Sequence, residues 1–372
     1  MKLETTLIHA GSEVDPATGA IAPPIHLSTT FEHGPAGEVP HGFSYIRVNN
    51  PTQARLEAAL ATVEGGEAAL VFASGLAAGA AYLQSLPPDS HVILHKDTYF
   101  GFREIASMFF GKWGCEYTIV DMKDTLSVRH ALLPNTRAIW METPSNPLLE
   151  VIDIAAMAQI AHTAGAQLVV DGTFATPVLQ RPLALGADVV LHAATKYLGG
   201  HSDVQMGALV FGKHDKAVQE ITHNRTILGA VASPFNSWLV LRGLRTLACR
   251  MDRHSANGLA VAQWLARQSQ VERVHYPGLA QHPGHEIAQR QMSSFGGMLS
   301  FQVKGGQERA IDVASRVKLF TNATSLGSVE SLLELRASSE GPGSAVPDNL
   351  LRVSVGLEAV EDLIADLQQA LG

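Results

Sequence analysis

The chain has 372 residues, which is more than one small core usually holds and predicts two or three packed units. Hydrophobic residues make up 46% and charged residues 17%, a composition opposite to that of a disordered chain. The formal net charge is −8, and no basic stripe could neutralise nucleic-acid phosphates. We therefore expect no nucleic-acid partner.

Cysteine usage and hydropathy indicate the compartment. Cys115 and Cys249 lie far apart and follow no metal-binding or redox spacing, which is typical of the reducing cytoplasm. An acid at Glu4 argues against a signal peptide. The uncharged stretch 68–88 is long enough to cross a bilayer, but its Ser, Gly and Pro residues favour a buried strand, loop and helix. We expect a cytoplasmic protein with no membrane partner.

Turn-forming residues are scattered through residues 1–50, and no helical period is sustained there. This segment is predicted to be an arm that contacts an adjacent subunit. A compact domain then begins at residue 51 with an amphipathic helical pattern.

Residues 51–240 alternate apolar runs with helical segments, as in an α/β domain. Strands buried on both faces read as continuous apolar runs, and the helices between them supply the crossovers of a mostly parallel sheet. The expected strands are 68–72, 91–95, 117–120, 138–141, 168–170, 189–191 and 208–211, and the clearest helices are 75–86 and 154–164.

Residues 241–372 have a different pattern. A long helical segment passes through Trp238, Leu241 and Leu244 into this part of the chain, and strands are expected at 271–275, 298–303 and 351–355. A helix is expected from 360 to 371. This pattern predicts a smaller α+β domain at the C-terminal end.

Several common nucleotide and catalytic motifs are missing. No G-x-G-x-x-G follows a strand, no P-loop sequence occurs, and no G-x-S-x-G turn presents a serine. His282 and His285 are separated by Pro and Gly, which spoil a common helical face, so we interpret them as loop residues and expect no metal site.

Three expected strand ends carry polar groups instead. Asp171 and Lys196 each follow an apolar run, and Ser74-Gly75-Leu76 opens directly into a helix whose free amides favour a phosphate. Locally, Asp171 could equally cap a helix and Lys196 could be a solvated lysine. Together they fit pyridoxal 5'-phosphate (PLP), whose aldehyde needs a lysine imine, whose ring nitrogen needs a carboxylate and whose phosphate needs a helix N-terminus.

Longer motifs extend this interpretation over nearly the whole chain, which resembles the Cys/Met metabolism PLP-dependent (trans-sulfuration) family. The resemblance implies PLP-dependent transferase fold type I, the aspartate aminotransferase-like α/β fold. It rests on Ser74 to Ala78, Glu142 to Pro147, Asp171 to Pro177, Thr195 to Asp203, Ser233 to Phe235, Leu241 to Leu244, Ser325 to Gly327, Glu330 to Leu332 and Leu351 to Glu358.

The resemblance implies a role for each cofactor residue. Lys196 would hold PLP through an imine and act as the catalytic base, Asp171 would pair with the ring nitrogen, and Tyr99 would stack on the ring and assist proton transfer. The phosphate would meet Gly75, Leu76 and Thr195, together with Tyr45 and Arg47 from the adjacent subunit.

The substrate is expected to be a small amino acid. Asn146 would sit beside the ring oxygen, and Arg352 would bind the substrate carboxylate, with Asn146 and Ser325 in the same subsite. Apart from the resemblance in the order of motifs along the chain, Tyr45 and Arg47 could be ordinary surface residues, and Arg352 could be an arginine that pairs with a helix. The resemblance also implies a homotetramer built from dimers that share active sites.

The implied activity is γ-replacement or γ-elimination on sulfur amino acids or activated homoserine, as in cystathionine γ-synthase or γ-lyase. Methionine γ-lyase and O-acylhomoserine sulfhydrylase are alternatives within the family. An aminotransferase, or a PLP-binding protein with weak activity, is a more distant alternative.

The chain departs from the family pattern at a few positions. Gly172 replaces a frequent Asn, Ala193 replaces a Ser that gives a phosphate hydroxyl, and Ile46 replaces a small residue. Thr324 stands where the cystathionine enzymes usually carry an acid, which puts the preference for cystathionine in doubt. The run 336–343 is also unusual, and Arg336 or Glu340 could add polar contacts unless this run is a solvated loop.

Overall fold

Seven strands form the larger sheet, in the order β1-β7-β6-β5-β4-β2-β3. The computed structural model describes residues 1–337 and 346–372. Neighbouring strands from β6 to β3 run parallel, whereas β7 is antiparallel to both β1 and β6, so the expected mostly parallel sheet is confirmed. The strands are β1 (Ala68–Phe72), β2 (His91–His95), β3 (Glu116–Val120), β4 (Thr136–Glu142), β5 (Gln167–Asp171), β6 (Val189–His192) and β7 (Gly207–Phe211).

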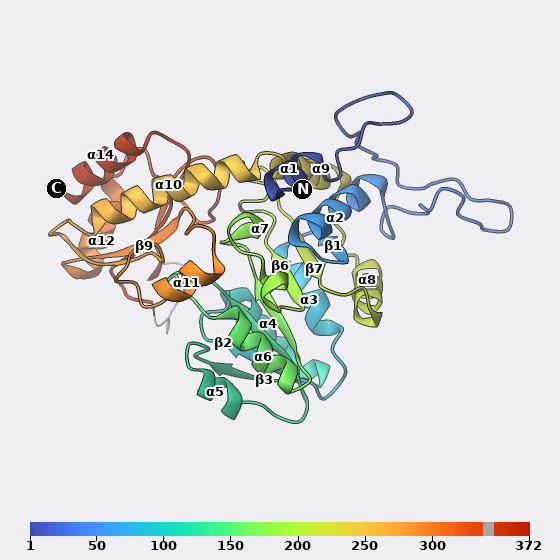
Figure 1. Ribbon diagram of the computed structural model, residues 1–372, viewed down its shortest axis with the longest axis horizontal. Helices are drawn as coiled ribbons and strands as arrows, with labels where there is room; N and C mark the ends of the chain where they lie inside the picture. Colours follow the sequence, from blue (N-terminus) through green and yellow to red (C-terminus); the bar gives the residue numbers. More distant parts are fainter. Residues whose placement is uncertain (338–345) are drawn as a thin grey trace.

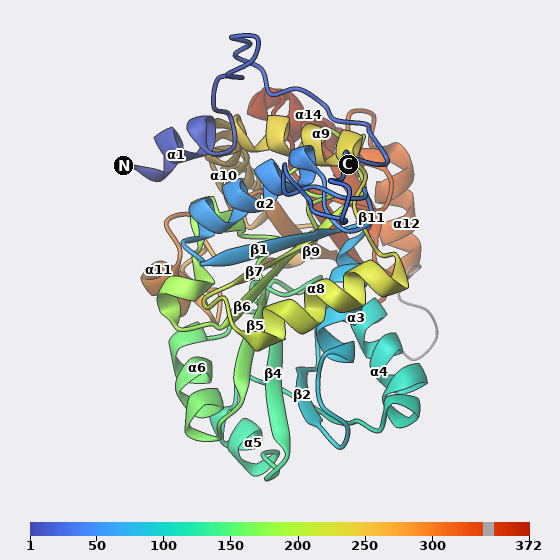
Figure 2. The ribbon, with the colours of Figure 1, turned by 90° about the vertical axis from the view of Figure 1, so that its right-hand side faces the viewer.

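Side chains that alternate along the strands of this sheet pack into two separate hydrophobic cores, one on each face. Val92 and Leu94 of β2 and Trp140 of β4 pack with the helices on one face, while Ile93 and Ile139 pack with those on the other. Figure 2 shows the helices on both sides of the sheet. The first face is covered by α3 (Gly75–Gln84), α4 (Phe100–Trp113) and α8 (Lys216–Leu228), and the second by α5 (Thr125–His130) and α6 (Ile154–Thr163).

A five-stranded sheet in the order β10-β11-β12-β9-β8 forms the second body of the chain. Neighbouring strands of this sheet run antiparallel, except that β10 and β11 are parallel to each other. The strands are β8 (Val271–His275), β9 (Met298–Val303), β10 (Thr321–Asn322), β11 (Leu332–Leu335) and β12 (Leu350–Ser354), and the helices beside them are α11 (His285–Gln291), α12 (Gly306–Arg316) and α14 (Val360–Leu371).

The sequence did not predict β10 and β11. The two residues of β10 are exposed, and Glu334 interrupts the apolar run of β11, although that carboxylate is 4% exposed. Four further helices are α7 (Thr176–Leu179), η1 (Pro182–Leu185), α9 (Pro234–Leu244) and α10 (Leu247–Leu265). Figure 1 shows α10 reaching from α9 to the second sheet.

The N-terminal segment contains one helix that we did not expect, α1 (Leu3–His9), which buries Leu7 against the main core. After α1, the chain extends away from the body in long loops as far as α2 (Pro51–Glu64) (Figure 1). The indole nitrogen of Trp238 donates to the carbonyl of Pro23 at 2.9 Å and ties these loops to α9. In the described ranges, none of the helices is both long and apolar enough to span a membrane.

Candidate active site

A cavity of about 430 Å³ lies between the two sheets, at the carboxyl ends of the parallel strands. It brings together most of the residues singled out from the sequence, although they come from distant parts of the chain. These lining residues are Gly75, Leu76, Tyr99, Asn146, Asp171, Thr195, Lys196, Ser325 and Arg352.

Lys196 reaches into this cavity from the loop after β6. Its Nζ donates to Oγ of Ser325 at 2.6 Å. Burial, followed by the positive charges of Arg352 and Arg336, lowers the pKa of Lys196 to about 8. About a tenth of the Lys196 side chains then carry an uncharged amine at pH 7, which is the form that reacts with an aldehyde or accepts a proton.

Asp171 ends β5 and is buried at the floor of the cavity. Its Oδ1 accepts a hydrogen bond from the backbone N–H of Thr173 at 3.0 Å, and the hydroxyl of Thr173 accepts from the N–H of Ala193 at 2.9 Å. Burial raises the pKa of Asp171. A buried carboxyl of this kind suits a cationic partner such as a protonated ring nitrogen, which would repay its desolvation.

The N-terminus of α3 forms another wall. Oγ of Ser74 caps the helix by accepting from the N–H of Ala77 at 3.1 Å, while Gly75 and Leu76 line the cavity. A Cβ on Gly75 would lie 3.2 Å from Cβ of Ala193, so glycine keeps this approach open. Aligned amides at the first turn of a helix are a suitable site for a phosphate.

The Thr195 hydroxyl is engaged within the chain. It accepts from the N–H of Met206 at 3.0 Å and donates to the carbonyl of Met206 at 3.2 Å. For Thr195 to donate to a phosphate, its proton must leave the Met206 carbonyl. This makes the helix amides, rather than the hydroxyl, the pre-formed part of the anion site.

Arg352 lies in β12 and is 4% exposed, so it is not the helix-pairing arginine considered as an alternative. Its Nη1 donates to Oδ1 of Asn146 at 3.1 Å, and its Nη2 donates to the carbonyl of Ser325 at 2.9 Å and to Oε2 of Glu334 at 2.6 Å. These contacts hold the guanidinium at the cavity wall. Because both Nη2 protons are already engaged, paired hydrogen bonds to a carboxylate require Nη2 to release one of these acceptors.

Arg336 also lines the cavity, and at 5% exposure it does not belong to a solvated loop. Its Nη1 donates to the same Oε2 of Glu334 at 3.1 Å. Glu340 lies outside the described residues. The sequence did not single out Glu334, although an acid inside an apolar strand pattern could have indicated a buried ion pair.

Tyr99 precedes α4, and its ring packs against Phe100 and Phe102 with centroid distances of 4.7 and 6.1 Å. Its backbone N–H donates to Oε2 of Glu142 at 3.0 Å. Glu142 is a second buried acid at this sheet edge, and the sequence reasoning gave it no role. Its place at the end of β4, beside the strand that ends in Asp171, was the available signal.

Tyr45 and Arg47 do not line this cavity within the single chain. They lie in the N-terminal arm, where the Arg47 guanidinium sits 5.6 Å from the Tyr45 ring centroid and its Nη1 donates to the carbonyl of Thr226 in α8 at 3.0 Å. Their predicted contact with a phosphate requires a second subunit.

Gly172 has a local explanation. A Cβ at this position would lie 3.0 Å from Cε1 of His192. That ring is fixed, because its Nε2 bonds to Oε1 of Glu64 at 2.5 Å. The glycine therefore accommodates a buried histidine without displacing the neighbouring Asp171.

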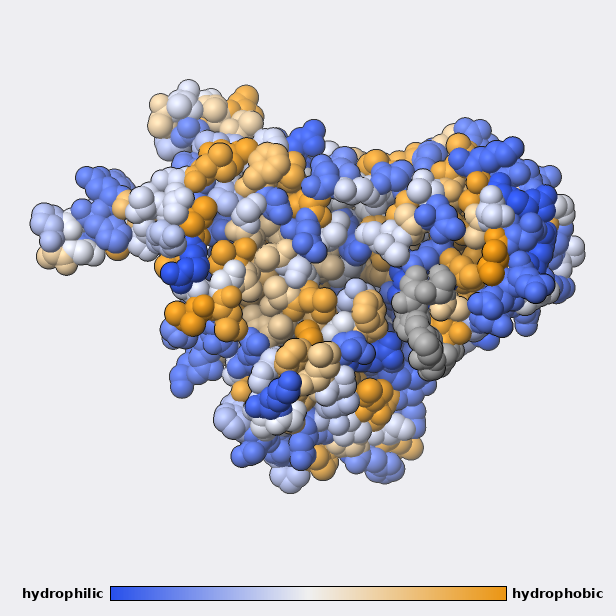
Figure 3. Space-filling model, turned by 180° about the vertical axis from the view of Figure 1, so that it is seen from behind, coloured by the Kyte–Doolittle hydropathy of each residue, from blue (hydrophilic) through white to orange (hydrophobic). Residues whose placement is uncertain are grey.

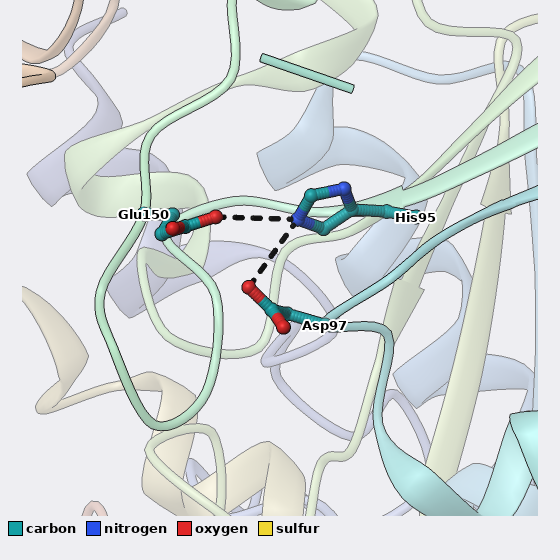
Figure 4. A group of neighbouring side chains, drawn as sticks. All are labelled: His95, Asp97 and Glu150. Carbon is teal, nitrogen blue, oxygen red and sulfur yellow. Dashed lines mark ion pairs between the residues drawn. The ribbon is translucent and has the colours of Figure 1, made fainter. Parts of the chain in front are cut away.

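A cluster with metal-ligand residue types lies elsewhere, at the ends of β2 and β4 (Figure 4). Nε2 of His95 is 3.7 Å from Asp97 and 3.8 Å from Glu150, but the ammonium of Lys96 lies 2.6 and 2.9 Å from the same two carboxylates. Nδ1 of His95 accepts from the N–H of Met122 at 3.2 Å, which places the proton of a neutral ring on Nε2. We interpret this cluster as an ion-pair network.

The two histidines differ in their surroundings: His282 lies in a loop, as expected, whereas His285 is the first residue of α11, so the expectation of a loop residue was wrong for it. Nδ1 of His282 accepts from the N–H of Gly284 at 3.0 Å, and Nδ1 of His285 bonds to the carbonyl of Pro277 at 2.7 Å.

Comparisons with known proteins show the family of this chain. The model of the Cys/Met metabolism PLP-dependent enzyme family matches residues 4–372. Cystathionine gamma-synthase of Mycobacterium tuberculosis H37Rv is 48% identical over 99% of this chain and 96% of its own length, and cystathionine beta-lyase of Coxiella burnetii is 43% identical over 99% and 97%. The structure of metB from Corynebacterium glutamicum superimposes with a TM-score of 0.96 at 44% identity, over 100% of this chain and 98% of the other.

A second solved structure, cystathionine gamma-lyase from Lactobacillus plantarum complexed with L-serine, has a TM-score of 0.95 at 38% identity and covers 100% of this chain and 98% of the other. The fold is therefore that of the PLP-dependent enzymes of fold type I, and the donor set of amine, buried carboxyl and helix amides fits this cofactor. The chain belongs to the Cys/Met metabolism PLP-dependent enzyme family, and PLP is its cofactor.

Proposed function

We propose that this enzyme catalyses γ-replacement on an activated homoserine, with a thiol amino acid as the incoming group, as a cystathionine γ-synthase does. The observation that carries the choice is the identity to relatives of that name, 48% over 99% of the chain, against 43% to 44% for the relatives named cystathionine beta-lyase. The cavity supports the class of reaction, because it places an amine, a buried acid and a guanidinium around one space.

In this proposal, four groups hold the cofactor within one subunit. Lys196 binds it covalently, Asp171 faces the ring nitrogen, Tyr99 stacks on the ring, and the amides of Gly75 and Leu76 meet the phosphate. When bound, PLP supplies an electron sink that stabilises the negative charge left by proton removal from the substrate.

Arg352 and Asn146 orient the substrate. The fork of Arg352 binds the α-carboxylate, and its contacts with Asn146 and Ser325 fix the angle of that fork. In this proposal the α-hydrogen faces Lys196, whose Nζ donates to the Oγ of the same Ser325. The shared neighbour links substrate orientation to the position of the base.

Lys196 then moves the protons. Its lowered pKa of about 8 makes the released amine a competent base for the α-hydrogen. Once that proton has been passed on, the same amine can remove a hydrogen from the β-carbon, and the electron pair left there expels the γ-substituent. The ammonium so formed returns a proton after the incoming thiol has added. We assign protonation of the leaving group at the γ-carbon to the phenol of Tyr99, which lines the same cavity.

A lyase activity is the second candidate, because a relative at 43% identity is named cystathionine beta-lyase and a structural neighbour is named cystathionine gamma-lyase. Thr324 lines the cavity in place of the usual acid, which affects how the distal part of a substrate is held. Methionine γ-lyase and O-acylhomoserine sulfhydrylase activities remain alternatives within the family.

Product analysis separates the synthase activity from the lyase activities. The purified enzyme is incubated with O-succinylhomoserine or O-acetylhomoserine, each with and without cysteine, and separately with cystathionine or methionine. The proposal predicts that cystathionine forms from an acylhomoserine and cysteine faster than 2-oxobutyrate forms from any substrate. Faster release of pyruvate or 2-oxobutyrate from cystathionine would instead identify a lyase.

We also propose a homotetramer of dimers in the cytoplasm, with Tyr45 and Arg47 completing the partner's phosphate site. The arm projects from the body of the chain, and it carries exposed Ile21, Leu27 and Tyr45. Figure 3 shows apolar surface gathered on the rear face of the molecule beside this arm. Both cysteines are present as free thiols, which suits a reducing compartment.

A further inference from the structure

Two buried acids lie side by side at the edge of the larger sheet. Glu142, the last residue of β4, is in register with Asp171, the last residue of β5. Because paired residues of neighbouring strands point to the same face, both side chains face the cavity that they line. Their exposed fractions are 5% and 6%. Two carboxylates held this closely in a dry site cannot both be charged at low cost.

The two acids have different partners. Asp171 accepts from Thr173, whose backbone belongs to the loop after β5. Oε2 of Glu142 instead accepts from the N–H of Tyr99 at 3.0 Å, and the backbone N–H of Asn146 forms a further hydrogen bond to Glu142. Glu142 thus connects the start of α4 with the loop after β4, the two segments that carry Tyr99 and Asn146.

The charge state follows from these surroundings. Burial, followed by the negative charge of Asp171, raises the pKa of Glu142 well above its usual value, and these effects outweigh the backbone hydrogen bonds from Tyr99 and Asn146, which lower it. Asp171 has His192 nearby as a compensating group, and Lys196 opens onto the same cavity. The pair is therefore expected to keep its negative charge on Asp171, where a protonated ring nitrogen would need it.

We propose that Glu142 is a positioning residue for the cofactor, an uncharged hydrogen-bonding acid that fixes the backbones of Tyr99 and Asn146 and leaves the charge on Asp171. The inference rests on the roles proposed above for Asp171, Tyr99 and Asn146. Glu142 need not touch the reacting atoms. By holding the two backbones, it sets the positions of the Tyr99 phenol, which stacks on the cofactor ring, and of the Asn146 amide, which lies beside the ring oxygen.

Two variants test this inference. Glu142→Gln keeps a neutral acceptor of similar shape, while Glu142→Met keeps the volume and removes the hydrogen bonds. Apoenzyme is titrated with PLP, and the pH midpoint of the visible absorbance change is recorded for each holoenzyme. Neither measurement uses a substrate, so the result is independent of whether the proposed γ-replacement is correct.

We expect Glu142→Gln to bind PLP within about threefold of the parent affinity with an unchanged absorbance midpoint, and Glu142→Met to bind about 10- to 100-fold more weakly. A midpoint lowered by about one pH unit in Glu142→Gln would show that a negative charge had been removed, and would overturn the proposal. Parent-like PLP binding by Glu142→Met would also overturn it. If Glu142→Met fails to fold, the Glu142→Gln midpoint still decides.

Asp366→Asn and Asp366→Ala provide the matched control. Asp366 is also a buried acid that accepts backbone N–H groups, those of Lys318, Leu319 and Phe320, but it lies in the second body of the chain. These variants should lower the melting temperature and leave PLP affinity and the absorbance midpoint unchanged. An equal loss of PLP affinity in the Asp366 variants would reduce the Glu142 effect to general destabilisation, and would contradict a positioning role.

Discussion

Each functional side chain in the cavity is held by a neighbour with a complementary group. Ser325 accepts from Lys196, Thr173 donates to Asp171, and Asn146 accepts from Arg352. Pre-organisation of this kind lowers the entropy cost of binding and keeps reacting atoms in place. For single residues, we therefore predict that small changes in these side chains affect substrate binding and proton transfer separately.

Removal of the Lys196 amine should abolish proton transfer without emptying the site. In Lys196→Ala, we expect turnover to fall by about 100- to 10,000-fold, because a positioned general base contributes on that scale. The measurement is the initial rate with the best substrate, together with PLP content after dialysis. Lys216→Ala, at an exposed position, is the control and should match the parent. Residual turnover above a tenth of the parent rate would contradict the assignment.

A lysine in place of Arg352 keeps the positive charge but loses the fork. Because Arg352 donates to three acceptors and is expected to bind a carboxylate in a bidentate manner, Arg352→Lys should lower kcat/KM by about 10- to 100-fold, mainly through KM. Steady-state kinetics with varied amino-acid substrate provides the test. Arg253→Lys serves as the control, because the Arg253 guanidinium donates to the backbone carbonyl of Glu358 at an exposed position outside the cavity. An unchanged KM would contradict the proposed binding of the substrate carboxylate by Arg352.

At the scale of the element, the parallel sheet decides which parts of the chain meet. Asp171 and Glu142 end neighbouring strands, so the sheet alone sets their proximity. The sequence predicted this edge because apolar runs followed by Asp171 and Lys196 are visible without a structure. It did not predict β11, because the burial of the Glu334 carboxylate depends on ion pairs with Arg336 and Arg352 that form only in the folded chain.

The loop after β4 is tied to the ends of β2 and β3 through Glu150. Burial alone would raise its pKa, but hydrogen bonds from Lys123 and Lys96 outweigh this effect and lower the pKa of Glu150 to about 2. A depressed carboxyl pKa stabilises the fold above the unfolded value of 4.5, and that stability is lost as the pH falls through about 2.

Glu150→Gln should therefore lower stability at pH 7 by about 1 kcal/mol, since the pair is partly exposed to solvent. The difference from the parent should shrink as the pH falls from 4.5 toward 2. Urea unfolding at several pH values measures it, with Asp312→Asn in the exposed part of α12 as control. A difference that stays constant down to the lowest accessible pH would show that the ion pairs are not its cause.

At the scale of the whole molecule, the cavity uses residues from both sheets and, in our proposal, from a second subunit. The order of motifs along the chain was enough to predict the fold type and the grouping of Lys196, Asp171 and Arg352. It could not show that Arg336 is buried beside Arg352, because this depends on the packing of β11 against β12. The high apolar content of the chain is accounted for by a sheet buried on both faces and by the apolar surface beside the arm.

If two subunits share each active site, a dimer that combines two different inactive variants should regain activity. Lys196→Ala and Arg47→Ala should each be nearly inactive alone, because one lacks the base and the other the partner's phosphate contact. After the two proteins are unfolded together and refolded, random pairing gives hybrid dimers with one intact site, so about a quarter of the parent activity should return. If the mixture gains no activity while a parent control refolds fully, Arg47 does not act across subunits.

In our proposal, Lys196 is the residue that holds PLP covalently. Reduction of the yellow holoenzyme with borohydride fixes the cofactor to the lysine that holds it, and peptide mass mapping then locates the modified residue. We predict that the pyridoxyl group is found on the peptide that contains Lys196, and that Lys196→Ala carries none. Modification of a different lysine, or of none after full reconstitution, would contradict the account.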